Sequence, residues 1–270
     1  MAFQAMGNWG SEVDLTDIEA LPAPERLGAR HNPIEHARLL ETTRRCFDMA
    51  NYELTEWKYL LSNDKQRMLA GFEIRHNNLP DYAEWSFTGA IMTSTNSTLS
   101  ARLLFGQTVS VCDNGCIWAE HILKHKHTFN AATNLKYMIM DKIENLETIT
   151  NDIHRQTETM KQIPMNDVKV HDFLVESCKR DVLKWQHAPL VLDQWNDPDY
   201  EDFKPRTQWS LFNAYTHVWK ERNQFELGAR SAKLIEHQDR WNHTEFVGTP
   251  TNDIESQEPD QDGKTRLLPI

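Results

Sequence analysis

Apolar and polar residues alternate with a period of two over three stretches in the first half of the chain, at residues 53–61, 68–75 and 82–91. This alternation is typical of half-buried β-strands. Turn-forming Asn, Asp and Pro residues separate the stretches, so we expect consecutive strands to pair in antiparallel fashion. A further alternating stretch at residues 107–112 predicts a fourth strand.

Helical periodicity replaces the alternation on either side of this β region. Residues 33–50 carry one apolar stripe and predict the first core helix. A long amphipathic helix is expected from about Leu135 to Pro164, followed by helices over residues 168–185, 208–225 and 229–241. The pattern therefore predicts an α+β fold, with an antiparallel sheet of about four strands followed by a mostly helical C-terminal half.

The two ends of the chain differ in composition from its middle. Residues 1–33 are acidic and contain Pro22 and Pro24, which interrupt any continuous helix, so we interpret this segment as an acidic N-terminal extension. Residues 248–270 are acidic with few apolar side chains, a composition typical of disorder. We expect a single core domain at residues 34–247 between them.

The junction between the two halves is residues 109–128, which read VSVCDNGCIWAEHILKHKHT. After the strand, Asp113-Asn114-Gly115 is a turn tripeptide, and the apolar positions that follow then fall at helical spacing. The stretch therefore predicts a strand, a turn and a helix that begins near Cys116.

Two kinds of site are conceivable at this junction. The N–H groups of a helix N-terminus attract anions, and lysines nearby would reinforce that attraction. The candidate anion or nucleic-acid contacts are Asn114, Gly115, Cys116, Lys124 and Lys126. Thiolate and imidazole groups are also zinc ligands, and the weaker metal candidates are Cys112, Cys116, His121 and His125. Because His127 points away from His121 and His125 on a helix, and no second close cysteine pair exists, we expect no metal site.

The net charge of the chain limits the kinds of binding partner that we expect for it. Forty acidic and 29 basic residues give a formal charge of −11, which argues against a broad basic face that coats duplex DNA but leaves room for a local basic groove. The sequence shows no apolar run near the ~20 residues that span a bilayer and no secretory signal, so we expect no membrane partner. Four cysteines without an export signal favour a reduced intracellular setting.

Sequence motifs for catalysis are not found. The chain has no phosphate-binding P-loop, dinucleotide-binding glycine pattern, G-x-S-x-G motif or H-E-x-x-H motif. We therefore expect a protein that is not an enzyme and that needs no cofactor.

Three segments together resemble the domain-of-unknown-function 932 family of phage/plasmid-like proteins. They are PIEHARLLETTRRC, GQTVSVCDNGC with the following KHKHT, and RTQWSLFNAYTHVWK, in the same order and at similar separations as in the family. The likeness covers roughly residues 31–246. Family members often carry an Asn-Ser-His-Asp-Lys stretch ahead of the V-C-D-N strand, where this chain has Asn96-Ser97 followed by Thr98-Leu99-Ser100. Any role that the missing His, Asp and Lys have in the family is therefore not assigned to this chain.

The resemblance implies an origin on a mobile element, a bacteriophage, and no established activity. Consecutive antiparallel strands followed by a long helix are also the plan of single-strand annealing recombinases, an analogy at the level of fold. The leading hypothesis is a non-enzymatic phage protein that self-associates and binds or anneals single-stranded DNA in the bacterial host cytoplasm. The alternatives are a structural or assembly protein of the virion, which contacts other phage proteins through the two tails, and a host-directed binding protein that counters defence.

Overall fold

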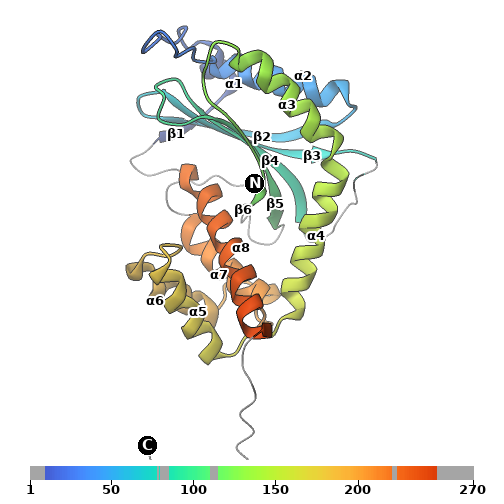
Figure 1. Cartoon of the computed structure of the whole chain (residues 1–270), viewed down its shortest axis with the longest axis vertical. Helices are drawn as coiled ribbons and strands as arrows, with labels where there is room; N and C mark the ends of the chain where they lie inside the picture. The colour runs from blue at the N-terminus through green and yellow to red at the C-terminus, as the bar shows by residue number, and fades with distance from the viewer. Residues whose placement is uncertain (1–9, 78, 80–84, 110–114, 221–223, 248–270) are drawn as a thin grey trace, which may run out of the picture.

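The fold is built on one antiparallel sheet of six strands, β1 to β6, which pair in the order of the sequence (Figure 1). The computed structural model describes residues 10–77, 79, 85–109, 115–220 and 224–247. The predicted class and the antiparallel order are confirmed, with six strands in place of about four. The strands are Gly10–Val13, Glu53–Ser62, Arg67–Arg75, Trp85–Ser94, Ala101–Val109 and Gly115–His125.

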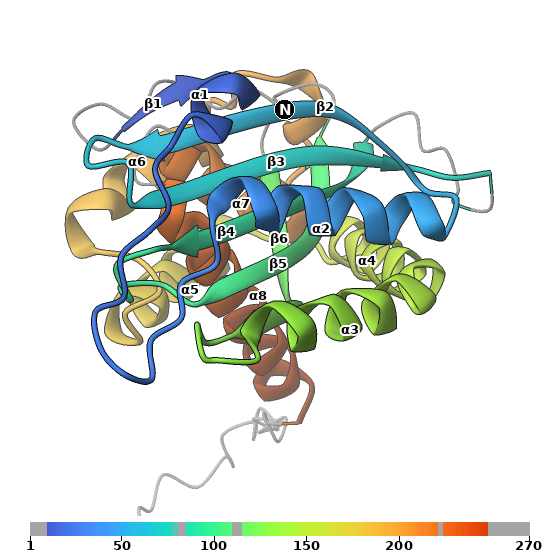
Figure 2. The same cartoon turned by 90° about the horizontal axis from the view of Figure 1, so that it is seen from above.

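Helices lie on both faces of the sheet. Helices α1, α2 and α3 cover one face, where α2 and α3 lie side by side (Figures 1 and 2). On the other side lie α5 to α8, and α8 packs against β6. Helix α4 runs from the sheet towards this second group (Figure 1). The helices are Leu15–Glu19, His36–Met49, Ala131–Glu144, Leu146–Gln162, Asp167–Lys179, Ala188–Asn196, Gln208–Lys220 and Gln224–Val247, with short 3-10 turns η2 at Trp185–His187 and η3 at Glu201–Phe203.

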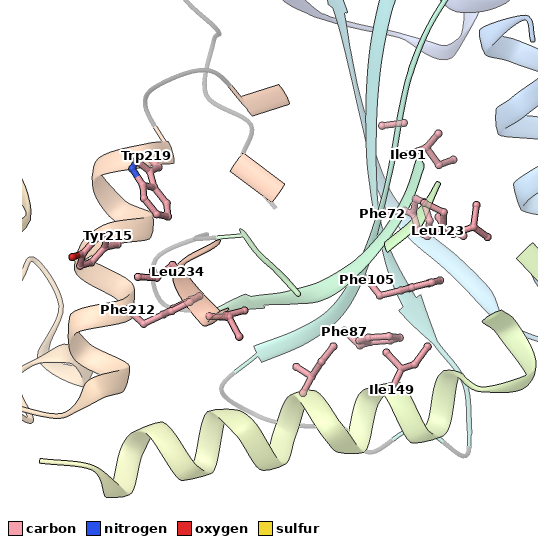
Figure 3. Close-up of a cluster of buried hydrophobic side chains, with 14 of the residues drawn as sticks. Phe72, Phe87, Ile91, Phe105, Leu123, Ile149, Phe212, Tyr215, Trp219 and Leu234 are labelled. Carbon is pink, nitrogen blue, oxygen red and sulfur yellow. The ribbon is translucent and has the colours of Figure 1, made fainter. Parts of the chain in front are cut away.

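Alternation along the strands divides the buried side chains between the two faces. The face under α2 and α3 carries the larger core, which continues through Ile149 of α4 to Phe212 and Tyr215 of α7 (Figure 3). The opposite face holds a smaller apolar cluster of Leu60, Leu69, Ala90, Met92 and Leu104. Since side chains of successive residues point to opposite faces, the strands contribute buried apolar side chains to both faces of the sheet.

The junction at residues 109–128 differs from its prediction. Residues 115–125 form strand β6, which pairs with β5, and the next helix begins only at Ala131. The helical spacing was misleading because β6 contains a bulge. Two residues of β5, Leu103 and Phe105, pair with Leu123 and Trp118, so three extra residues on β6 interrupt the period of two. Residues 110–114, which include Cys112 and Asn114, lie outside the described residues.

Two further predictions need correction. Residues 10–19, placed by their composition in an N-terminal extension, form β1 and α1, and Ile18 is buried in the larger core. The predicted long helix after Leu135 is two helices, because Asn145 ends α3 and its side chain donates a hydrogen bond to the carbonyl of Asp141 (2.8 Å). The predicted tail at residues 248–270 lies outside the described residues. Within the described residues, no helix combines the length and apolar character needed to cross a bilayer.

Candidate functional site

The predicted anion contacts are divided between the two ends of β6. Gly115 pairs with Thr108 at the start of the strand, whereas Lys124 pairs with Arg102 near its end. Their partners on β5 are six residues apart, so at about 3.3 Å per residue these ends are roughly 20 Å apart. Gly115 and Cys116 therefore cannot share a small anion with Lys124 and Lys126 in one molecule, and Asn114 is not described.

The same geometry separates the metal candidates. Cys116 and His125 lie near opposite ends of β6, and His121 and His125 are four residues apart on a strand instead of adjacent on a helix. The side chains of Cys116 and His121 are outside the described part of the chain, as is Cys112. Among the described residues, no group of three or more His, Cys, Asp and Glu side chains is arranged to bind a metal ion.

A row of basic side chains does gather at the end of the sheet where Lys124 lies. Strands β3 and β5 begin here and β4 and β6 end here, because neighbouring strands run in opposite directions. Arg67, Arg102 and Lys124 alternate with the larger-core residues Met68, Leu103 and Leu123, and so project from the other face of the sheet. Lys126 follows directly after β6 and is exposed. We call Arg67, Arg102, Lys124 and Lys126 the basic edge.

The turn between β4 and β5 positions both arginines of the basic edge. The side-chain oxygen of Asn96 accepts hydrogen bonds from the backbone N–H (3.2 Å) and hydroxyl (2.6 Å) of Thr98. The Thr98 hydroxyl in turn accepts a hydrogen bond from Nε of Arg67 (3.0 Å), and the Ser100 hydroxyl accepts one from Nε of Arg102 (3.4 Å). Neutral hydroxyl groups therefore orient the guanidinium groups without cancelling their charge.

Within the described residues, none of the four basic-edge side chains has a carboxylate at ion-pair distance. Cations elsewhere are often paired, as in Lys179 with Glu176 (2.7 Å) and Arg155 with Asp152 (2.8 Å). Like charges directly opposite each other in a sheet, such as Arg102 and Lys124, are destabilising. The basic edge therefore concentrates positive charge that is not held in ion pairs, in a chain of net charge −11.

Acidic residues mark the boundary of the basic edge. A cavity of about 450 Å³ lies beside it, between the segment 18–27 and the turns that follow β2 and β4, and its lining includes Glu19, Glu25, Glu35 and Asp64 with Lys65. A hydrogen bond from the Ser62 hydroxyl and the nearby charge of Arg67 lower the pKa of Asp64. That carboxylate is thus held charged, and it limits the basic edge on the β2 side.

Two buried histidines fasten the segment before α2 to this end of the sheet. The backbone N–H of Ile34 donates to Nδ1 of His127 (3.2 Å), so the neutral ring carries its proton on Nε2, which contacts the Thr93 hydroxyl (3.1 Å). Nε2 of His36 lies 3.3 Å from the carbonyl of Lys65. Residues 21–35, which we call the strap, are thereby held beside the ends of β3 and β4, as Figure 2 shows.

Burial keeps these two histidines neutral. For His127, burial and then the neighbouring rings of His31, His36 and His125 lower the pKa to about 4. For His36, burial lowers the pKa to about 4 against the opposing hydrogen bond to Lys65. At neutral pH the charge at this end of the sheet therefore comes from arginine and lysine, and these histidines act as structural hydrogen-bonding groups.

Two of the four basic-edge residues are among the contacts predicted from the sequence, and their role in anion binding stays a prediction. Lys124 and Lys126 were among the predicted contacts, although the structure places them at the end of a strand and not at a helix N-terminus. Arg67 and Arg102 were missed, because only the strand register shows that they lie beside Lys124. The available signal was their position within the first two residues of strands β3 and β5.

A six-stranded antiparallel sheet with helices on both faces defines the class as an α+β protein, and the basic edge at its turns is the candidate site. The family model described as "Domain of unknown function (DUF932)" matches residues 27–244, and the chain belongs to this family. The predicted resemblance is therefore confirmed. No curated protein and no solved structure matches the chain.

Proposed function

We propose that this chain is a phage-encoded, non-enzymatic protein of DNA metabolism, which binds single-stranded DNA at the basic edge and anneals it as an oligomer. The observation that carries the proposal is the basic edge itself, four cations of which none lies at ion-pair distance from a described carboxylate. Phosphate contacts supply most of the sequence-independent affinity for nucleic acid.

The arrangement of these cations favours a polymer over a small anion. Arg67 lies on β3, Arg102 on β5 and Lys124 on β6, and strands in a sheet are about 4.8 Å apart, so the row extends over roughly 15 Å. A single phosphate is normally surrounded by converging donors instead. An extended row matches successive phosphates along a strand.

Fluorescence anisotropy with a labelled single-stranded oligonucleotide, over a range of salt concentrations, tests the proposal. For four phosphate contacts, the plot of log binding constant against log salt concentration is expected to have a slope of about −3. The variant Arg102→Gln with Lys124→Gln is expected to lose about tenfold or more in affinity at low salt and to reduce the slope by roughly 1.4.

The matched control is Arg155→Gln with Lys179→Gln, which changes net charge equally but on α4 and α5, at ion-paired positions. It should bind almost as the unaltered chain does. Absence of binding at low salt, or an equal loss in the control, would remove the proposal. Mixing complementary labelled strands with the protein, and measuring its mass in solution, tests annealing and self-association separately.

A second candidate, a structural or assembly protein of the phage particle, is favoured by a different observation. Val168 and Val175 on α5, Trp185 in η2 and Leu190 on α6 are exposed large apolar side chains. Helices α5 and α6 are joined by a hydrogen bond from the Trp195 indole to Asp167 (3.3 Å), so these side chains belong to neighbouring elements. Exposed apolar groups of this kind are typical of protein–protein contacts. Mass spectrometry of purified particles would decide, since absence from the virion excludes this candidate.

A further inference from the structure

Two large aromatic side chains are exposed shortly after the basic edge in the chain, Phe129 in the turn before α3 and Tyr137 on α3 itself. Phe129 is 80% exposed and Tyr137 is 70% exposed. Thr133 and Tyr137 are four residues apart and share one face of α3, and Phe129 lies in the turn four residues before Thr133. Thr133 and Lys136, the residue next to Tyr137, are exposed as well. We call Phe129, Thr133 and Tyr137 the aromatic stripe. The stripe is open to solvent along its length.

Hydrogen bonds attach this aromatic stripe to the end of β6. The side-chain amide of Asn134 on α3 lies 3.5 Å from Nε2 of His125, and Nδ1 of His125 lies 2.6 Å from the carbonyl of Lys126. Phe129 comes three residues after Lys126 in the chain. The aromatic stripe and the basic edge are therefore neighbours in sequence and in space.

The two features lie on different sides of the sheet. Arg67, Arg102 and Lys124 alternate with larger-core residues and so project from the face opposite to the one that α3 covers, and Lys126 lies between Lys124 and Phe129 in the chain. A ligand that contacts both features has to pass around the end of β6. A flexible single strand can follow this path, whereas a stiff duplex cannot bend within so short a distance.

The positive charge of the basic edge and the exposure of the aromatic side chains together indicate which ligand would bind the aromatic stripe. Flat aromatic side chains next to phosphate-binding cations are how proteins bind unpaired bases without sequence preference. Paired bases in a duplex do not present their faces to such side chains. Asp141 and Glu144 follow on α3 beyond Tyr137. Their negative charge repels phosphates and so limits how far a bound strand can extend along α3.

We propose that Phe129 and Tyr137 stack on unpaired bases of a nucleic acid strand whose phosphates lie along the basic edge. This inference rests on the proposed function and deepens it, because it makes the ligand a base-bearing single strand in preference to any other polyanion. It assigns recognition of bases to α3 and the turn before it, and recognition of phosphates to the strand ends.

The test uses the full chain and the double variant Phe129→Ala with Tyr137→Ala, with three labelled ligands of equal length. They are a mixed-sequence single strand, an abasic deoxyribose-phosphate strand and a duplex. We expect the unaltered chain to bind the base-bearing strand about tenfold or more tightly than the other two. The double variant should lose that preference and bind the base-bearing strand as it binds the abasic one, with an unchanged salt slope.

Two further variants serve as controls. Phe129→Trp with Tyr137→Phe preserves flat rings and should retain the preference, while Val168→Ala with Trp185→Ala removes exposed apolar side chains on α5 and η2 and should change nothing. Because all these positions are exposed, thermal melting curves of the variants are expected to match that of the unaltered chain.

The outcomes separate the two proposals. If the double alanine variant keeps the preference for bases while Arg102→Gln with Lys124→Gln loses binding, the stacking inference is overturned and the proposed function stands. An equal loss on base-bearing and abasic strands also overturns it, since stacking acts only on bases. If the unaltered chain binds no single strand at all, both proposals fail.

Discussion

Gly89, in the middle of β4, is required by a close approach between neighbouring strands. A Cβ atom at this position would lie 2.4 Å from Cε2 and 2.6 Å from Cζ of Phe72 on β3. The Phe72 ring cannot easily move, because Trp57 and Phe47 pack against it with ring centroids 4.5 and 5.9 Å away. Glycine in a strand interior is otherwise unfavourable, so its presence here indicates that the aromatic ring occupies the space of the missing side chain.

We predict that Gly89→Ala lowers the free energy of unfolding by about 1–3 kcal/mol, the usual cost of overpacking a core. Gly28→Ala is the control, because a Cβ there meets nothing within 4 Å, and it should be neutral or stabilise by up to about 1 kcal/mol. Urea denaturation measures both. Equal stability of the two variants would contradict the steric role assigned to Gly89.

His36 and His127 make stability depend on pH in a defined direction. Each has a pKa of about 4 in the fold, below the ordinary value of 6.5, so between these two values the unfolded chain binds a proton that the folded chain does not. Stability is therefore complete above pH 6.5 and falls as the pH decreases towards 4, by at most roughly 3 kcal/mol for each ring. Below pH 4 the two contributions stop changing.

We predict that His127→Gln loses stability at pH 7.5, where the bonds to Ile34 and Thr93 are disturbed, and loses less than the unaltered chain on going to pH 5. Urea midpoints at the two pH values measure the difference. His171→Gln on α5, an exposed position, should keep the full pH dependence. A parallel decline of all three proteins would show that His127 does not titrate in the expected window.

At the scale of elements, the period-two strands were predictable and the bulged one was not. Strands β2, β3 and β4 were recognised because their apolar positions alternate where they face the core. In β6, by contrast, the bulge shifts the alternation partway along the strand, and Trp118 and Ile122 then mimic a helix. β1 was missed because four residues, three of them polar or Gly, give no pattern, and the strand depends on its pairing with β2.

The candidate site, like the strands, could be predicted from the sequence only in part. Lys124 and Lys126 stand out in the sequence because they cluster, but a cluster does not identify its spatial neighbours. Arg102 joins them only through the β5–β6 register, and Arg67 only through two further strand pairings. Long-range contacts of this kind carry no local sequence signal, so half of the site required the structure.

Strand β5 and helix α4 are joined by a buried pair of polar side chains. The Thr157 hydroxyl donates to Oε1 of Gln107 (3.3 Å), both residues are fully buried, and the amide nitrogen of Gln107 has no partner among the described residues. Thr157→Val should cost about 1–3 kcal/mol of unfolding free energy, because the amide then loses its last partner. Adding Gln107→Leu should recover most of that loss or exceed it. A double-mutant cycle by chemical denaturation measures the coupling, and additive effects would rule it out.

For the molecule as a whole, the fold extends beyond the region that defines the family. The family model begins at residue 27, yet β1 and α1 lie before that point and Ile18 of α1 is only 1% exposed. The acidic composition that suggested a separate extension reflects the solvent-facing positions of this segment. Its apolar positions belong to the common core.

We predict that Ile18→Ala lowers the free energy of unfolding by about 2–4 kcal/mol, as for other buried aliphatic residues. Leu27→Ala is the matched control, since Leu27 is 63% exposed and should change stability by less than about 0.5 kcal/mol. Thermal unfolding followed by circular dichroism measures both. A single transition that shifts with Ile18→Ala would show that the N-terminal segment unfolds with the rest, whereas an unshifted transition would make it an independent appendage.

The order of the strands also determines how the chain can reach this structure. Each of the strands β2 to β6 pairs with its nearest neighbour in sequence, so the sheet can grow hairpin by hairpin at a small entropic cost of loop closure. β1 is different, because Gly10 has to find Ser62 across α1, the strap and α2. The N-terminal strand is therefore expected to dock last during folding and to exchange its amide hydrogens first in the native state.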